Sequence, residues 1–166
     1  MHKIKPALII WLVLLVPSMA HAETKLIEGV ASVIDGDTIE IHGQRIRLSG
    51  IDAPESGQTC TKNGKPYLCG NAAAFALSDK IGRQVVTCEQ TGIDRYKRAL
   101  AVCFLNETDL CEWMVSQGQA LAFRKYSTEY VPTEDKARAA RLGLWAGEFQ
   151  NPWDWRKEKR DGRKTW

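Results

Sequence analysis

Polar and apolar residues alternate over the stretch from residue 27 to residue 49. Residues 27–34 are rich in β-branched side chains, residues 38–42 alternate between polar and apolar, and residues 45–49 alternate again. A period of two is typical of strands with one buried face, and the glycine at position 43 suits the turn between the second and third stretches. The pattern predicts a three-stranded meander.

The apolar spacing changes to that of a helix after residue 70. Leu77 and Ile81 recur on one face, Asn71 is of a residue type that caps helix starts, and Gly82 is of the type that ends helices. These features predict a helix over 71–82.

Two further strands and two further helices are predicted downstream. Residues 84–89 and 98–105 have strand character and flank a turn at 91–94. Asp109 is placed to cap the next helix, with Glu112 as its capping-box partner.

The last predicted helix covers 127–142, where Pro132 lies close enough to the start to be tolerated. We find no repeat and no internal linker, which predicts a single domain over 23–155. Five strands combined with helices predict an α+β fold, namely a five-stranded OB-type β-barrel with three packed helices.

The first 22 residues have the composition of a signal peptide. Lys3 and Lys5 precede an apolar run at 7–16, and Ala-His-Ala at 20–22 is a cleavage motif. The apolar run is about half of the roughly 20 residues that a membrane-spanning helix needs. We therefore expect export to the periplasm or the medium, with no membrane association after cleavage. An uncleaved anchor is the alternative, which the cleavage motif disfavours.

Net charge gives no support for nucleic-acid binding. Removing Lys3 and Lys5 with the signal peptide leaves 21 basic against 20 acidic residues, a net charge of +1. A local basic excess lies in the C-terminal tail, residues 156–166. Its basic residues are Arg156, Lys157, Lys159, Arg160, Arg163 and Lys164, with Glu158 and Asp161 among them. We expect this tail to be a frayed, solvated end, and the alternative is an arm that follows phosphates.

The five cysteines are expected to form disulfides, because an exported chain enters an oxidising compartment. Cys60 and Cys69 bracket a polar loop, which a bridge between them would close. Cys88 and Cys103 lie in two apolar runs on either side of a turn, which suits a cross-strand bridge. Cys111 is then left over, and we expect it to be buried and inert. A zinc site is disfavoured, since no Cys-x2-Cys pair occurs.

Histidine is scarce in the predicted mature chain. His42 is the one that remains once His2 and His21 leave with the signal peptide. Ribonuclease chemistry that needs two histidines is therefore excluded, and a Ser-His-Asp triad or a histidine-rich zinc site is disfavoured.

Three short polar clusters interrupt the predicted strands. They are Asp-Gly-Asp-Thr at 35–38, Arg47 with Asp52 and Glu55, and Asp-Arg-Tyr-Lys-Arg at 94–98. Each cluster alone is commonly a turn or a surface segment. Together they supply carboxylates that can hold a metal or activate water, and arginines that can bind a phosphate. Hydrolysis of a phosphodiester needs both, so the clusters indicate a metal-dependent nuclease.

Arg47 and Asp52 would face opposite sides of an ideal strand, so a bend is needed to bring them together. Gly50 between them permits one. Asp37, Asp52 and a backbone carbonyl would form an oxygen site that suits Ca²⁺. Oxygen ligands also admit Mn²⁺ or Mg²⁺, whereas most transition metals prefer nitrogen or sulfur.

The three clusters resemble the staphylococcal-nuclease (thermonuclease) family, secreted bacterial type. Later stretches fit the same family, and the likeness covers nearly all of the predicted mature chain. The matching segments are 33–38, 46–48, 51–55, 94–101, 117–118, Tyr126, 137–138 and 143–146. The resemblance implies hydrolysis of DNA and RNA with little sequence preference. We expect the protein to act as a monomer.

The resemblance also implies a role for each matched carboxylate. Asp37 and Asp52 would ligate Ca²⁺ together with the backbone carbonyl of Ala53. Asp35 would support these ligands without touching the metal. Glu55 would act as the general base that activates water.

The matched arginines and tyrosines would contact the substrate. Arg47 and Arg98 would bind the phosphate and stabilise the transition state. Arg95, Tyr96 and Tyr126 would lie along the bound nucleotides, where ring stacking tolerates any base.

Lys97 departs from the family, which usually has glycine at this position. If that glycine serves a left-handed turn, Lys97 strains the turn or shifts Arg98. The other interpretation of the whole chain is a non-catalytic OB-type envelope module that binds oligonucleotide or polysaccharide. Arg47, Glu55 and Arg98 are all present, which favours the enzyme.

Overall fold

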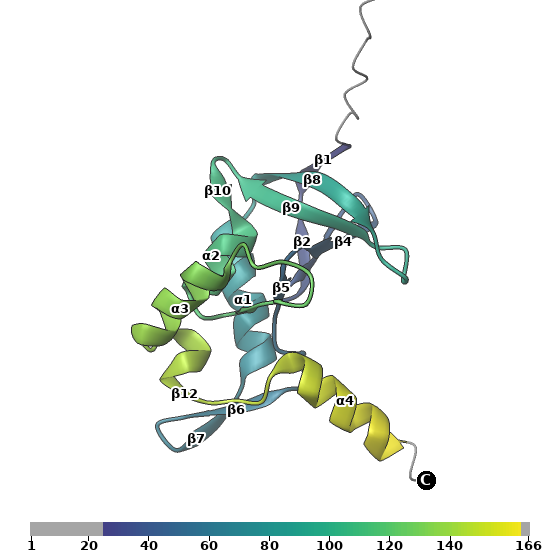
Figure 1. Cartoon of the computed structure of the whole chain (residues 1–166). Helices are drawn as coiled ribbons and strands as arrows, with labels where there is room; N and C mark the ends of the chain where they lie inside the picture. The colour runs from purple at the N-terminus through teal and green to yellow at the C-terminus, as the bar shows by residue number, and fades with distance from the viewer. Residues whose placement is uncertain (1–24, 164–166) are drawn as a thin grey trace, which may run out of the picture.

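The computed structural model describes residues 25–163, which form a curled sheet with helices on one side of it (Figure 1). The predicted signal peptide, residues 1–22, lies outside the described residues. Within 25–163, no helix is long and apolar enough to cross a membrane.

The main sheet has the strand order β1-β8-β9-β4-β3-β2, and β10 pairs with β9. Its strands are β1 (Leu26–Val30), β2 (Ser32–Asp35), β3 (Thr38–Ile41), β4 (Gln44–Leu48), β8 (Val85–Ile93), β9 (Ala99–Leu105) and β10 (Thr108–Asp109). The two edge strands, β1 and β2, follow one another in the chain with only Ala31 between them. The sheet therefore curls strongly on itself, as an OB-type sheet does.

The predicted single strand at 27–34 is wrong in detail, because the chain divides there into β1 and β2. The first pairs with β8 and the second with β3. The strand predicted at 84–89 is also longer in the structure: β8 continues to Ile93, with a bulge between Gln90 and Gly92. The turn that follows starts at Asp94 instead of lying at 91–94.

Residues 25–163 contain four α-helices, where the sequence predicted three. They are α1 (Cys69–Ile81), α2 (Leu110–Ser116), α3 (Val131–Ala139) and α4 (Pro152–Arg163), with a 3-10 turn η1 (Gly143–Ala146). The α+β, OB-type architecture is confirmed. Helix α4 takes the place of the predicted frayed tail. Its polar sequence lacks the apolar stripe that would have revealed it.

Several helix boundaries differ from the prediction. Helix α1 begins at Cys69, so Asn71 is not its cap, and it ends before Gly82 as predicted. The Asp109 carboxylate does cap α2, accepting from the backbone N–H of Cys111 at 2.7 Å. Glu112 is not the capping-box partner of Asp109, because the Glu112 carboxylate accepts from the Thr133 hydroxyl of α3 at 2.9 Å.

The polar loop between Cys60 and Cys69 is a β-hairpin. Its strands are β6 (Thr59–Lys62) and β7 (Lys65–Leu68), and β12 (Gly147–Glu148) pairs with β6. Asn63 and Gly64 both have positive φ, 52° and 72°, as a two-residue hairpin turn of this hand requires. The predicted Cys60–Cys69 disulfide joins the hairpin to the start of α1.

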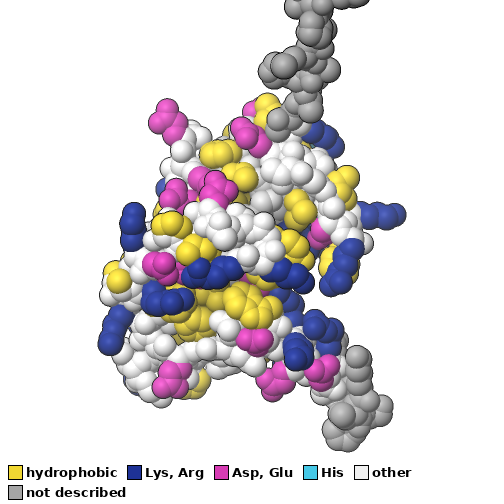
Figure 2. Space-filling model, viewed as in Figure 1, with side chains coloured by type: hydrophobic (Ala, Val, Ile, Leu, Met, Phe, Trp, Pro, Cys, Tyr) yellow, Lys and Arg dark blue, Asp and Glu magenta, His cyan; other side chains and the backbone are white. Residues whose placement is uncertain are grey.

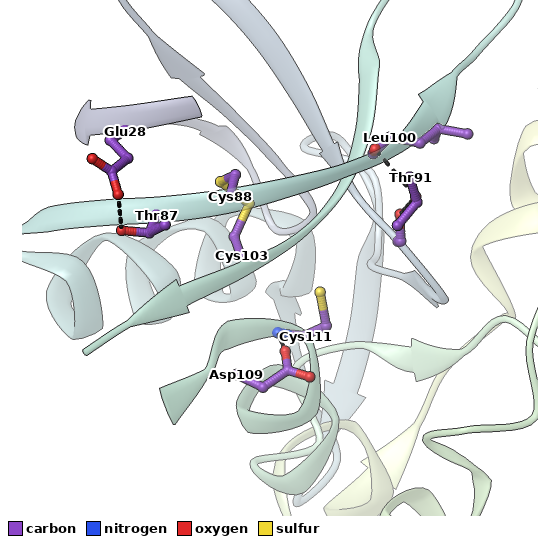
Figure 3. Close-up of a disulfide and its surroundings, with 9 residues drawn as sticks. Glu28, Thr87, Cys88, Thr91, Leu100, Cys103, Asp109 and Cys111 are labelled. Carbon is purple, nitrogen blue, oxygen red and sulfur yellow. Dashed lines mark hydrogen bonds between the residues drawn. A yellow bond between two sulfur atoms is a disulfide. The ribbon is translucent and has the colours of Figure 1, made fainter. Parts of the chain in front are cut away.

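The main core lies between the curled sheet and helices α1 and α2. Its fully buried members include Ile39, Ile46, Leu77 and Met114. The predicted Cys88–Cys103 disulfide joins β8 to β9 inside this core. Figure 3 shows Cys111 at the start of α2, beneath that disulfide and separate from it.

The Cys111 thiol is expected to be unreactive in the native protein. It is fully buried, and burial raises the pKa of its thiol to about 12. Since the thiolate is the reactive form, a thiol reagent should label no cysteine in the native, unreduced chain. It should label one in concentrated guanidinium, and all five after reduction. Labelling of two or more cysteines before reduction would contradict the disulfide pairing.

Candidate active site

A bend after β4 brings Arg47 and Asp52 together. Gly50 has a φ of +76° and separates β4 from the short strand β5 (Ile51–Asp52). The Arg47 Nη2 donates to Asp52 Oδ1 at 2.8 Å and to the Ile51 carbonyl at 3.2 Å. A Cβ at Gly50 would lie 2.8 Å from the Tyr130 ring, so the position has no room for a larger residue. The bend predicted at Gly50 is confirmed.

Asp37 lies on the other side of the same guanidinium. It follows β2 at the turn into β3, and its Oδ2 is 2.5 Å from Arg47 Nη1. The same oxygen accepts from the backbone N–H of Ala53 at 2.7 Å. Asp35 lies behind this contact, where its Oδ1 accepts from the Asp37 backbone N–H at 3.0 Å. The turn at 35–38 and the segment after β5 therefore form one cluster.

Glu55 joins the cluster through Arg156 of α4. The Arg156 Nη1 donates to Glu55 Oε1 at 2.7 Å and to Asp52 Oδ1 at 3.0 Å, and its Nη2 donates to Asp52 Oδ2 at 2.7 Å. The sequence predicts a frayed, solvated tail from residue 156, and this prediction is wrong for Arg156, which lies in α4 and contacts Asp52 and Glu55. The neighbouring tryptophans, Trp153 and Trp155, are the features of the sequence that indicate a segment docked on the protein.

The loop that carries Glu55 is held by Gln58, which the sequence did not single out. Gln58 is fully buried, and its side chain accepts from the Glu55 N–H at 3.3 Å and donates to the Gln150 carbonyl at 2.6 Å. The backbone carbonyl of Gln58 accepts from the Cys69 N–H at 3.1 Å. The adjacent Gly70 lies so close that a Cβ would meet the Glu55 carbonyl at 1.8 Å. Gln58, Cys69 and Gly70 thus position the Glu55 backbone.

Arg98 lies just before β9, the strand that pairs with β4 in the sheet. Asp94 holds it: its Oδ2 accepts from Arg98 Nε at 2.7 Å, and its Oδ1 accepts from the Arg98 backbone N–H at 3.0 Å. The Arg98 Nη1 lies 3.5 Å from the hydroxyl of Thr38, the residue after Asp37. Burial acts to raise the pKa of Asp94, but the Arg98 hydrogen bonds outweigh it and lower the pKa.

Lys97 has a φ of +65°, in the left-handed region. Its N–H donates to the Asp94 carbonyl at 3.0 Å, and this closes the turn that aims Arg98. The strain expected of a lysine at this position is therefore present in the backbone. The hydrogen bonds that Arg98 donates to Asp94 nevertheless hold it toward Thr38.

Replacing Lys97 with glycine is expected to stabilise the fold by up to about 1 kcal/mol, because glycine adopts a positive φ without strain. The measurement is urea-induced unfolding followed by tryptophan emission. Lys97→Ala is the matched control, since it removes the same side chain but keeps the Cβ. Equal stability of the glycine and alanine variants would show that the turn carries no such strain.

The two tyrosines predicted to bind nucleotides are exposed to solvent. Tyr96 is 63% exposed and has the Arg95 guanidinium 4.8 Å from its ring centroid. Tyr126 is 72% exposed and meets Phe123 edge to face at 4.9 Å. The two tyrosines are accessible to a ligand, one near Arg98 and the other beside a groove.

The groove has a volume of about 580 Å³. On one side it is lined by the short strand β11 (Leu121–Ala122) and the residues that follow it, and on the other by the start of α4. Phe123 and Trp153 stack within it, 5.8 Å apart and nearly parallel. Arg124, Lys125 and Arg138 line it as well. Figure 2 shows hydrophobic side chains bordered by Lys and Arg on this face of the molecule. Strand β11 pairs with β5, so the groove adjoins the segment that carries Asp52.

Burial dominates the electrostatics of the carboxylates. It raises the pKa of Asp35 to about 6, assisted by the nearby charge of Asp37. It also raises the pKa of Asp52, which the hydrogen bonds from Arg156 oppose. Burial lowers the pKa of Arg156, but its hydrogen bonds to Asp52 and Glu55 outweigh this and raise it. A buried carboxylate such as Asp52 is stable as an anion only beside cationic groups.

The donor set fits a hard cation. Asp37 and Asp52 are both buried, at 7% and 0% exposure, and one oxygen of each contacts the same guanidinium, that of Arg47. Over residues 25–163, no group of three or more His, Cys, Asp or Glu side chains is arranged to hold a metal by itself. A cation here would therefore also need ligands other than these side chains, such as backbone carbonyls or water.

Fold and site together define an OB-type protein whose sheet carries a cluster of carboxylates and arginines. The sequence pattern of the family described as "Staphylococcal nuclease homologue" matches residues 45–147. A protein of Shigella flexneri named micrococcal nuclease is 34% identical over 150 residues, which cover 80% of this chain and 81% of that protein. The chain belongs to the staphylococcal nuclease family.

Two other relatives carry different names. The succinoglycan biosynthesis protein ExoI of Rhizobium meliloti (strain 1021) is 38% identical over 122 residues, 70% of this chain and 63% of that protein. An uncharacterized endonuclease of Haemophilus influenzae is 32% identical over 139 residues, 79% of this chain and 73% of that protein. The chain thus spans less than two thirds of the rhizobial relative. Helix α4 lies outside the family match, whereas Arg47, Asp52, Glu55 and Arg98 lie inside it.

Proposed function

We propose that this chain is an exported, metal-dependent endonuclease that hydrolyses phosphodiester bonds of DNA and RNA with low sequence selectivity. The observation that carries the proposal is the cluster in which Arg47 contacts both Asp37 and Asp52. Glu55 is joined to Asp52 through Arg156, and Arg98 Nη1 lies 3.5 Å from the Thr38 hydroxyl beside Asp37. Two arginines beside carboxylates provide both the positive charge and the base that attack on a phosphate anion requires. The names of the Shigella and Haemophilus relatives support the same reaction.

Ca²⁺ is the proposed cofactor, held by Asp37, Asp52 and the backbone carbonyl of Ala53, with Asp35 supporting Asp37 from behind. When bound, the cation would supply positive charge at the phosphoryl oxygen. Glu55 would accept the proton of the attacking water, because its backbone is held by Gln58 and its side chain is partly exposed. Arg47 and Arg98 bind the non-bridging phosphate oxygens and stabilise the added charge of the transition state.

The groove beside α4 and the exposed tyrosines suit a single strand of nucleic acid. Tyr96 and Tyr126 offer ring faces to bases, and Arg95 adds a charge for the phosphates. Stacking reads every base alike, which is the physical reason for low selectivity. Phe123 and Trp153 extend the aromatic surface away from Tyr126 along the groove.

Two disulfides are compatible with an exported protein, since such bonds persist in oxidising compartments. We therefore propose a periplasmic or extracellular enzyme that has no membrane association once its predicted signal peptide, residues 1–22, is cleaved. We further propose that it acts as a monomer, because the residues of the cluster all come from one chain.

The test is degradation of denatured DNA and of RNA by the chain from residue 23 onward, with Ca²⁺ and with a chelator. An acidic polysaccharide serves as a third substrate, because one relative is named for succinoglycan biosynthesis. Calcium-dependent loss of both nucleic acids, with the polysaccharide intact, is the expected result. A folded protein that binds these polymers but cuts none of them with Ca²⁺, Mn²⁺ or Mg²⁺ would instead be a binding module.

A further inference from the structure

Helix α4 is fixed to the site by its first turn. The Gln58 side chain donates to the Gln150 carbonyl at 2.6 Å just before the helix. Trp153 stacks on Phe123. These contacts place Arg156, one turn further on, directly over Asp52.

Arg156 forms a two-pronged contact with Asp52. Its two terminal nitrogens each meet one Asp52 oxygen, at 3.0 Å and 2.7 Å, and Oδ1 also accepts from Arg47. The same guanidinium contacts Glu55 at 2.7 Å. Both oxygens of Asp52 are therefore bonded to arginine, and a paired geometry of this kind is among the stronger ionic contacts in proteins.

A divalent cation and Arg156 need the same oxygens. A cation that ligates Asp52 through Oδ2 takes the oxygen that Arg156 Nη2 holds at 2.7 Å. It would also be a third positive charge beside a carboxylate that already contacts Arg47 and Arg156, and both would repel it. Without any cation, Asp52 would be a buried anion paired with Arg47 alone. The guanidinium of Arg156 thus places positive charge at the Asp52 oxygens that the proposed cation would use.

We propose that Ca²⁺ must displace Arg156 from Asp52, so that metal binding and the docking of α4 oppose each other. This inference rests on the proposed function, since it takes Asp52 as a metal ligand. Coupling of this kind is reciprocal: α4 weakens metal binding, and metal loosens α4 by the same factor.

The first experiment measures Ca²⁺ binding by titration calorimetry in the absence of nucleic acid. Arg156→Gln should bind Ca²⁺ at least about tenfold more tightly than the unmodified chain, within the usual range of coupling between sites. Arg160→Gln is the matched control, because Arg160 is an exposed residue one turn along the same helix and its loss changes net charge equally. Arg156→Lys, which keeps the charge but not the paired geometry, should lie between the two.

The second experiment needs no variant. Amide hydrogen exchange in α4 of the unmodified chain should become faster when Ca²⁺ is added, while exchange in the sheet should not. Equal Ca²⁺ affinity of Arg156→Gln and Arg160→Gln, or slower exchange in α4 with Ca²⁺, would overturn the inference. Failure of both variants to bind Ca²⁺ would overturn it as well.

Comparison with the cleavage assay separates the two proposals. A shift in Ca²⁺ affinity at Arg156 in a protein that cuts no nucleic acid would support the displacement and reject the nuclease. If the protein cuts nucleic acid with Ca²⁺ but Arg156→Gln binds Ca²⁺ as tightly as the unmodified chain, the displacement is rejected and the nuclease is supported.

Discussion

Arg47→Ala is expected to abolish cleavage and also to lower the free energy of unfolding by about 3 kcal/mol, as loss of one partner from a buried ion pair does. Arg47 lies between Asp37 and Asp52, with contacts at 2.5 and 2.8 Å, and all three side chains are nearly or fully buried. Its removal takes away a phosphate ligand and also leaves two buried carboxylates short of a cation. Chemical denaturation measures the stability, and the rate of DNA hydrolysis measures the activity.

Calcium provides the control for this variant. Because a bound cation replaces the missing charge, Ca²⁺ should restore part of the lost stability of Arg47→Ala without restoring cleavage. An Arg47→Ala protein as stable as the unmodified chain in the presence of chelator would contradict the ion-pair account of the cluster.

Arg98→Ala should reduce turnover by about 10²–10³-fold, which is the usual effect of removing one donor that stabilises transition-state charge. It should leave the stability nearly unchanged, because its ion pair with Asp94 lies near the surface and such pairs contribute little. The measurements are the same two as for Arg47→Ala.

Arg98→Lys is the matched variant, since it retains the charge and loses the planar pair of donors. It should recover only a small part of the activity if Arg98 binds phosphate through two nitrogens. Full activity of Arg98→Ala would contradict its catalytic role, and full activity of Arg98→Lys would mean that charge alone matters there.

The two arginines looked equivalent in the sequence, and the structure distinguishes them. The family resemblance gives both the same role, binding of the phosphate. Motif spacing shows which residues gather, but it does not show how deeply each is buried. Burial decides whether a lost charge affects activity alone or stability as well.

The sheet was predictable because its strands obey local rules. Alternation at 38–42 and 45–49 predicted β3 and β4. The bend at Gly50 was predictable because Arg47 and Asp52 would face opposite sides of a straight strand. The division of 27–34 into two strands was not predictable, since it depends on which partner each half finds across the curled sheet.

The parts of the site that the sequence missed depend on long-range contacts. Gln58 is linked to Gln150, and Arg156 to Asp52 and Glu55, about a hundred residues away along the chain. A polar helix such as α4 carries no apolar stripe, so it is attached by single contacts that no periodicity reveals. The left-handed backbone at Lys97, in contrast, was predictable. The family usually has glycine at this position, and glycine is the residue that adopts a positive φ most readily.

The most direct test of the account compares the unmodified chain with Glu55→Gln, at saturating Ca²⁺ and on one denatured DNA substrate. Glutamine keeps the shape and can still accept from Arg156, but it is a far weaker base than a carboxylate. The account predicts a fall in turnover of at least about a hundredfold with unchanged DNA binding, as expected for loss of a general base. Turnover equal to that of the unmodified chain would show that Glu55 is not the base and that the carboxylate–arginine cluster works in another way.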